Sequence, residues 1–143
     1  MEQRRRTSDT NKLLMARVYD AINAGDLDAV DDVVAEEIVE HEEFPGVEQG
    51  REGFKKFFHT LRAGFPDLRF TVVDMVAEDE QVAALVTVTG THRGDFLGVE
   101  PSGREIRLSA IDIVRFVDGK AIEHWGVMDA MTLMQQLGAA ASG

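Results

Sequence analysis

The chain has 143 residues, of which 44% are apolar and none is a cysteine. This length suits one domain with a buried core, and the lack of cysteine excludes disulfides, thiolate nucleophiles and Cys-based zinc sites. The formal net charge of −11 makes nucleic acid and anionic membrane surfaces unfavourable partners. No apolar run is long enough for a membrane helix, and none follows the basic N-terminus as in a secretory signal, so we expect a soluble, cytoplasmic protein.

The first half of the chain has mainly helical patterns. Residues 1–8 are polar, and we expect them to be disordered. Apolar residues then recur at helical spacing in three segments, with capping residues before them and glycine or proline after them. The expected helices run from Asp9 or Thr10 to about 25, from 26 to about 34 and from about 50 to 65, with a short strand over 38–43 before the third.

The second half is rich in Val, Ile, Thr and Phe, and it predicts strands joined by hairpins. We expect strands over 68–77, 82–93, 105–117 and 120–128, then a short helix over 129–137 and a disordered tail over 139–143. Helices followed by antiparallel strands indicate an α+β fold. We predict one domain over 1–143, a cone-shaped, curved, mostly antiparallel sheet with three N-terminal helices packed on it and a short C-terminal helix. The mouth of such a cone is a natural ligand site.

The turn Asp118-Gly119 allows a contact to be predicted from sequence. If it is a two-residue hairpin loop, counting back along both strands pairs Asp112 with Trp125. Side chains alternate between the faces of a strand. On this register, Asp112 and Trp125 share one face of the sheet, and His124 lies on the opposite face.

Asp112 is an unusual residue for its place, because it stands between Ile111 and Ile113 in an otherwise apolar strand. If it lines a pocket, loss of water would raise its pKa and make it usable as a general acid or base. If it is structural, it would form an ion pair with Arg107 or Arg115, or face solvent on an edge strand. Both interpretations are compatible with the sequence.

Two histidines at strand ends are further candidates for the cone mouth. His41 and His92 could face a ligand there, although a histidine at a strand end is more often a hydrogen-bonded surface residue. Together with Glu42 and Glu43 they include the right types of metal ligand, but they lack a spacing typical of a metal site. We therefore expect no metal.

Two aromatic residues on the helices could contact a ligand. Tyr19, the single tyrosine, is either a core residue or a phenol that hydrogen-bonds a ligand oxygen. Phe58 belongs to a phenylalanine stripe that is most simply explained as helix core, and it is also a candidate substrate contact.

Read in order, several short motifs resemble those of the SnoaL-like polyketide cyclases, over about 13–138 of this chain. The motifs are Phe65-Pro66-Asp67, Gly90-Thr91-His92-Arg93-Gly94-Asp95-Phe96-Leu97-Gly98, Pro101-Ser102-Gly103, Asp112-Ile113-Val114-Arg115, Asp118-Gly119-Lys120 and Glu123-His124-Trp125. The resemblance implies the cone-shaped fold that is shared with nuclear transport factor, ketosteroid isomerase and limonene epoxide hydrolase. It also implies a homodimer formed through the sheet.

The resemblance further implies a reaction and a set of site residues. Asp112 would act as acid and base for an intramolecular aldol closure of a hydrophobic, polyketide-like substrate, without metal or cofactor. His92, His41 or Tyr19 would donate a hydrogen bond to the developing oxyanion. Trp125 would also line the pocket.

Two other classes of function remain open from the sequence. One is another enzyme on the same scaffold, an epoxide hydrolase or an isomerase, since a fold does not determine a reaction. The other is a non-catalytic module that binds a small molecule or docks a partner through its sheet.

Overall fold

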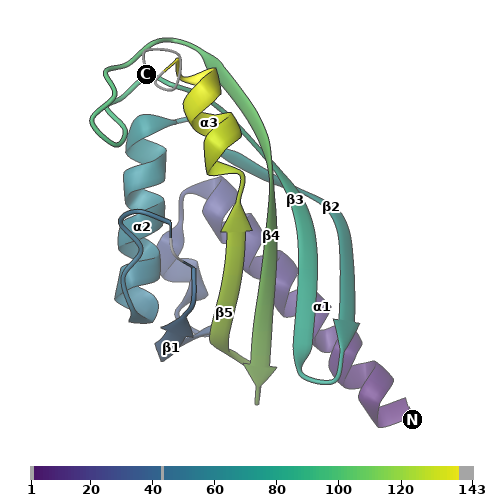
Figure 1. Ribbon diagram of the computed structural model, residues 1–143. Coiled ribbons are helices and arrows are strands. Elements are labelled where there is room, and N and C mark those ends of the chain that lie inside the picture. The colour runs from purple at the N-terminus through teal and green to yellow at the C-terminus, as the bar shows by residue number, and fades with distance from the viewer. Residues whose placement is uncertain (1, 43, 139–143) are drawn as a thin grey trace.

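The computed structural model describes residues 2–42 and 44–138, and in it helices pack against one curved, five-stranded sheet (Figure 1). The elements in chain order are α1 Glu2–Ala24, the 3-10 helix η1 Leu27–Val30, β1 Val34–Glu40, α2 Gly50–Gly64, β2 Arg69–Glu78, β3 Gln81–Thr91, β4 Glu105–Val117, β5 Lys120–Met128 and α3 Ala130–Gln136. The strand order is β1-β5-β4-β3-β2, with β1 parallel to β5 and every other pair antiparallel. The predicted α+β cone is confirmed.

The N-terminal boundaries differ from the prediction in three places. Residues 2–8, expected to be disordered, form the first turns of α1, where Thr7 Oγ1 donates to the carbonyl oxygen of Gln3 at 2.9 Å. The predicted second helix is a single 3-10 turn. The predicted strand at 38–43 begins at Val34, because this segment pairs with β5, and it ends at Glu40. The expected disordered tail, 139–143, lies outside the described residues.

The hairpin between β4 and β5 contains the main correction. The turn at Asp118-Gly119 forms as predicted, with Val117 opposite Lys120 and positive φ at both turn residues. A bulge at Ile122 then adds one residue to β5, so Asp112 lies opposite Gly126 and not Trp125. An extra residue turns every later side chain to the other face of the sheet. The predicted faces of His124 and Trp125 are therefore wrong.

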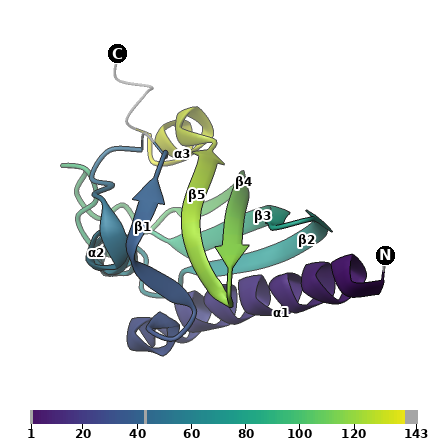
Figure 2. The same cartoon turned by 90° about the horizontal axis from the view of Figure 1, so that it is seen from below.

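The concave face of the sheet holds the core. Helix α1 lies across β2 and β3, and α2 packs beside β1 (Figure 2). Apolar residues of β3 and β4 such as Val86 and Phe116 are fully buried beneath these helices. One end of the cone is filled by aromatic rings, including the buried Phe65 and Phe96, whose centroids lie 5.3 Å apart. Neither Phe65 nor Phe96 lines the cavity, whose walls come from other residues of α1, α2 and the sheet.

No helix in the described part of the chain is long and apolar enough to cross a membrane.

Candidate functional site

A mostly apolar cavity lies between α1, α2 and the concave face of the sheet. Its walls include Phe54, Phe57 and Phe58 of α2, together with Phe70 and Phe116 from the sheet. Six of its lining residues carry polar side chains: Tyr19, Glu40, Glu42, Glu48, Asp112 and His124. An apolar hollow with a few convergent polar groups is the usual form of a small-molecule site.

Asp112 stands at the centre of the polar group. Its side chain is 17% exposed, and its two oxygens accept hydrogen bonds from two other elements. Tyr19 of α1 donates its hydroxyl to Oδ2 at 2.6 Å, and His124 of β5 donates from Nε2 to Oδ1 at 2.8 Å. The carboxylate is thereby held in one orientation against the cavity.

His124 is bound by carboxylates at both ring nitrogens. Nε2 contacts Asp112, and Nδ1 lies 2.7 Å from Oε1 of Glu40. Each nitrogen can contact an ionised carboxylate favourably only as a donor, so the ring carries both protons and a positive charge. Burial alone would lower the pKa of His124, but these hydrogen bonds and negative charges outweigh it and raise the pKa from 6.5 to about 10.

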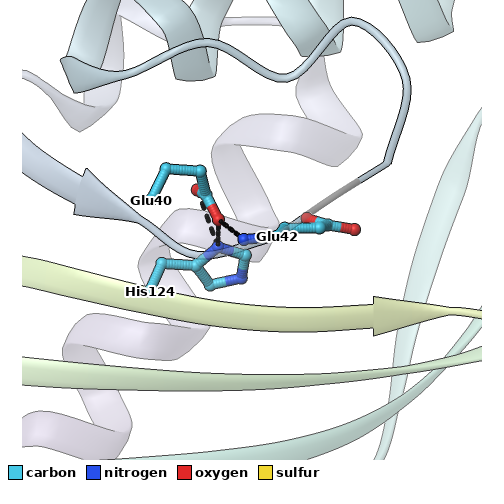
Figure 3. Close-up of side chains that lie close together, drawn as sticks. All are labelled: Glu40, Glu42 and His124. Carbon is cyan, nitrogen blue, oxygen red and sulfur yellow. Dashed lines mark hydrogen bonds and ion pairs between the residues drawn. The ribbon is translucent and has the colours of Figure 1, made fainter.

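Figure 3 shows the Glu40 carboxylate of β1 directed at Nδ1 of His124, whereas the Glu42 carboxylate, from the segment after β1, extends past the ring and away from Glu40. The backbone N–H of Glu42 donates to Oε1 of Glu40 at 2.8 Å, which fixes the path of the chain. Burial raises the pKa of Glu42 from 4.5 to about 7; the positive charge of His124 opposes this shift, and the negative charges of Asp112 and Glu40 add to it. Glu42 therefore exchanges its proton near neutral pH.

The same three side chains offer ligand atoms within 4.8 Å of one another, which is close enough for a cation. A metal bound there would have to take Nδ1 of His124 away from Glu40 and remove a proton from the ring. Both ring nitrogens already hold hydrogen bonds to carboxylates, Nδ1 to Glu40 and Nε2 to Asp112. We therefore interpret the group as a hydrogen-bonded proton network and not as a metal centre.

Tyr19 joins this network as a donor. Burial, followed by the negative charge of Asp112, the hydrogen bond to it and the charge of Glu42, raises the pKa of Tyr19 far above its usual value. The phenol therefore keeps its proton and donates a hydrogen bond to Asp112. Its ring stacks on Phe70 with centroids 6.1 Å apart, which fixes it in the cavity wall.

The structure brings together three of the six residues predicted for the site. Asp112, Tyr19 and Phe58 line one cavity. His41 and Trp125 lie instead on the outer face of the sheet, where their rings stack with centroids 4.8 Å apart. The bulge in β5 explains the misplacement of Trp125, because it reverses the alternation of side chains along that strand.

His92, predicted to be a catalytic donor, does not line the cavity. It is fully buried at the filled end of the cone, 5.5 Å from the Phe65 ring, and its Nδ1 accepts a hydrogen bond from the backbone N–H of Ser102 at 3.3 Å. His92 follows the last residue of β3, Thr91, and its side chain points into the fold. The space beyond it is occupied by phenylalanine rings, so a ligand has no room there.

His124, Glu40 and Glu42 line the cavity although the sequence did not predict them as residues of this site. His124 was assigned to the wrong face because a bulge leaves no distinct pattern in the sequence. A signal for the two glutamates was present, since they stand two positions apart around His41 and alternate positions of an extended chain share a face.

The cone-shaped α+β fold encloses a mostly apolar cavity lined by a few partly buried acid and base groups, which is the usual form of a small-molecule site. The family model of the SnoaL-like polyketide cyclases matches residues 12–137, and the chain belongs to this family.

Relatives with and without solved structures agree with this assignment. The chain is 27% identical to nogalonic acid methyl ester cyclase of Streptomyces nogalater over 124 residues, covering 82% of this chain and 90% of the relative. It is 33% identical to IdmH of Streptomyces antibioticus, a candidate polyketide cyclase, with a TM-score of 0.79 over 89% of this chain and 97% of that one. It is 34% identical to AclR of Streptomyces galilaeus, a candidate hydroxylase, with a TM-score of 0.79 over 89% and 94%.

Proposed function

We propose that this protein is an enzyme that closes a ring in a hydrophobic, polyketide-like molecule by acid and base chemistry, without a cofactor. The observation that supports this most directly is the Asp112 carboxylate, which is oriented by two donors inside a mostly apolar cavity. Membership of a family of polyketide cyclases supports the class of substrate.

In the proposed reaction, Asp112 takes a proton from a carbon next to a substrate carbonyl. Each of its oxygens accepts one hydrogen bond, and a carboxylate has about four acceptor sites, so lone pairs remain for this proton. The enolate carbon forms a bond to a second carbonyl carbon of the same molecule, whose oxygen becomes an alkoxide. Asp112 then returns the proton to that oxygen, so atoms and electrons balance without an oxidant.

The surroundings of Asp112 suit this role. The positive ring of His124 contacts Oδ1 of Asp112 at 2.8 Å and holds the carboxylate in one orientation, in a place with little water. The phenylalanine walls fold a flexible substrate so that its reacting carbons meet, which supplies part of the rate by proximity.

The test is Asp112→Asn. The amide has nearly the shape of the carboxylate but cannot take up the proton, so we expect turnover to be lost while folding and ligand binding persist. Nogalonic acid methyl ester and related poly-carbonyl esters are suitable trial substrates, with ring closure followed by chromatography and binding by calorimetry. Glu123→Gln, on the outer face, is the matched control and should keep full activity. Full activity in Asp112→Asn would end this proposal.

A second candidate is hydroxylation, because the chain is 34% identical to AclR. Adding molecular oxygen and a two-electron reductant to the same assay, and looking for a product one oxygen heavier, distinguishes the two reactions. Epoxide hydrolysis by an Asp/Arg/Asp set has less support, since no arginine lines the cavity in the described part of the chain. A ligand that binds tightly and leaves unaltered would favour the non-catalytic binding module.

The expected homodimer stays a proposal, supported by exposed apolar side chains on the outer face of the sheet. Ile111 and Val127 lie opposite each other on β4 and β5 and are exposed. A second copy of the chain would cover them and gain hydrophobic burial. Sedimentation of the wild type and of Val127→Glu measures this, and a dimer that survives the charged variant would place the contact elsewhere.

A further inference from the structure

Gly126 makes room for a second acidic group beside Asp112. It lies directly opposite Asp112 across β4 and β5, on the cavity face. A Cβ atom built on Gly126 would stand 2.9 Å from Oε2 of Glu42 and 2.8 Å from Cε1 of His124. Glycine inside a strand often marks a place where another group approaches closely. Here that group is the Glu42 carboxylate, which occupies the space that a side chain at 126 would take.

No hydrogen bond among the described residues gives the Glu42 carboxylate a structural role. Among the residues that the structure describes, none donates a hydrogen bond to it, whereas Asp112 and Glu40 each accept bonds from neighbouring groups. It lines the cavity. A partly buried carboxyl group whose oxygens accept no hydrogen bond from the described residues is available to a ligand.

The titratable groups that face Glu42 come from several elements around it. They are the carboxylates of Asp112 on β4 and Glu40 on β1, the positive ring of His124 on β5, the neutral phenol of Tyr19 on α1, and Glu48 before α2, which pairs with Lys56. Carboxylates outnumber cations in this group. The neutral form of Glu42 is therefore favoured over the ionised form at a pH where an exposed glutamate has lost its proton.

We propose that Glu42 is a second catalytic residue of the cavity, a neutral acid that protonates the substrate oxygen while Asp112 acts as the base. This inference rests on the proposed ring closure. Asp112 takes the proton from carbon, the new carbon–carbon bond forms, and the electron pair of the attacked carbonyl moves to its oxygen. That oxygen accepts the proton of Glu42, and the proton on Asp112 then returns to Glu42 through solvent. One proton has moved from carbon to oxygen.

Dividing the work between two carboxyl groups has a chemical advantage. A single Asp112 would have to carry its proton from the carbon to a different atom of the substrate. With Glu42 above Gly126 and Asp112 opposite Gly126, acid and base are adjacent but separate, so both protons can move near their own substrate atoms.

The experiment compares the pH dependence of kcat in the wild type and in Glu42→Gln, with Glu37→Gln as the control. Glu37 is exposed on β1 and undergoes the same loss of charge. In the wild type we expect kcat to fall as pH rises through about 7, where Glu42 ionises. In Glu42→Gln we expect that fall to vanish and kcat at pH 6 to drop about 100-fold, within the range of general acid catalysis. Glu37→Gln should match the wild type.

The outcomes separate this inference from the proposed function. If Asp112→Asn is inactive and Glu42→Gln keeps the wild-type profile, Glu42 is not the acid and ring closure by Asp112 stands. If Asp112→Asn is active, the proposed function itself fails. A measurement without substrate is the carboxyl carbon resonance of Glu42, assigned by its loss in Glu42→Gln. We expect it to titrate near pH 7, and titration near 4.5 would overturn the inference.

Discussion

On each face of the β4–β5 hairpin a histidine contacts a carboxylate, in very different surroundings: His124 comes from β5 itself, and His41 from the segment after β1. On the inner face, His124 lies between Asp112 and Glu40 and is 16% exposed. On the outer face, His41 contacts Glu123, and its side chain is 38% exposed. Both faces have a nitrogen–oxygen distance of 2.7 Å, so geometry alone does not distinguish a surface pair from a proton-handling network.

Glutamates near the two histidines show what the difference in burial does. On the outer face, hydrogen bonds from His41 and Arg115 lower the pKa of Glu123. On the inner face, burial raises the pKa of Glu42 to about 7. The residue type is the same and the shifts are opposite, because Glu123 accepts hydrogen bonds from two basic side chains, whereas Glu42 is buried and no described residue donates to it. Burial without a donor therefore distinguishes the inner face from the outer one.

The largest expected difference between the two faces is the effect of removing each histidine on the free energy of unfolding. His124→Gln leaves two partly buried carboxylates without their cation, so we expect a loss of about 3–5 kcal/mol in the free energy of unfolding. His41→Gln removes a solvent-screened pair and should change it by less than about 1 kcal/mol. Urea denaturation of both variants measures this, and equal losses would mean that burial does not separate the two faces.

A second test follows the free energy of unfolding with pH. The folded pKa of His124 lies above its unfolded value of 6.5, so its contribution is present below pH 6.5 and is lost as the pH rises toward about 10. Glu42 acts in the same direction between 4.5 and about 7, because its raised pKa favours the neutral form in the fold. We expect a decrease on the order of a few kcal/mol from pH 6.5 to 10. The decrease should flatten in His124→Gln and persist in His41→Gln.

Removing the Tyr19 hydroxyl tests how much its hydrogen bond to Asp112 contributes to catalysis inside the cavity. Tyr19→Phe keeps the ring against Phe70 and deletes only the hydrogen bond of 2.6 Å to Asp112. A hydrogen bond to a charged group is worth about 1.5–3 kcal/mol, so we expect kcat/KM to fall by roughly tenfold or more. Steady-state kinetics measures this, and an unchanged kcat/KM would show that Asp112 does not need this donor.

The smallest effect concerns two aromatic residues that the sequence placed together in the site. Phe58 lines the cavity and contacts Phe70, whereas Trp125 lies on the outer face. Phe58→Leu should raise KM, because it removes part of the apolar wall. Trp125→Leu should leave KM unchanged and lower the free energy of unfolding by about 1 kcal/mol, the worth of its stacking on His41. A rise in KM for Trp125→Leu would return it to the site.

Local patterns predicted most of the architecture. The strands 105–117 and 120–128 have the predicted bounds, and the turn between them forms at Asp118-Gly119. These features depend on residues close in sequence, namely β-branched runs and a turn that needs positive φ. The first turns of α1 were missed because polar, charged residues are compatible with both an exposed helix and a disordered end.

The composition of the site was harder to predict. Asp112 was singled out because a carboxylate in an apolar strand is conspicuous in any register. From the sequence, Glu42 was considered only as a metal ligand and set aside for lack of a typical spacing, and Glu40 had no predicted role. Their importance appears only when β1 pairs with β5 and brings them against His124.

By itself, then, the sequence determined the class of fold, the order of its strands along the chain and the one carboxylate most worth testing. Tertiary structure alone decided that His124 and not Trp125 accompanies Asp112, and that His92 lies in the filled end of the cone. The physical reason is the separation in sequence of the residues that determine each feature. Helix periods, strand alternation and turns come from neighbouring residues, whereas a bulge, a filled end and access to water depend on segments that meet only after folding.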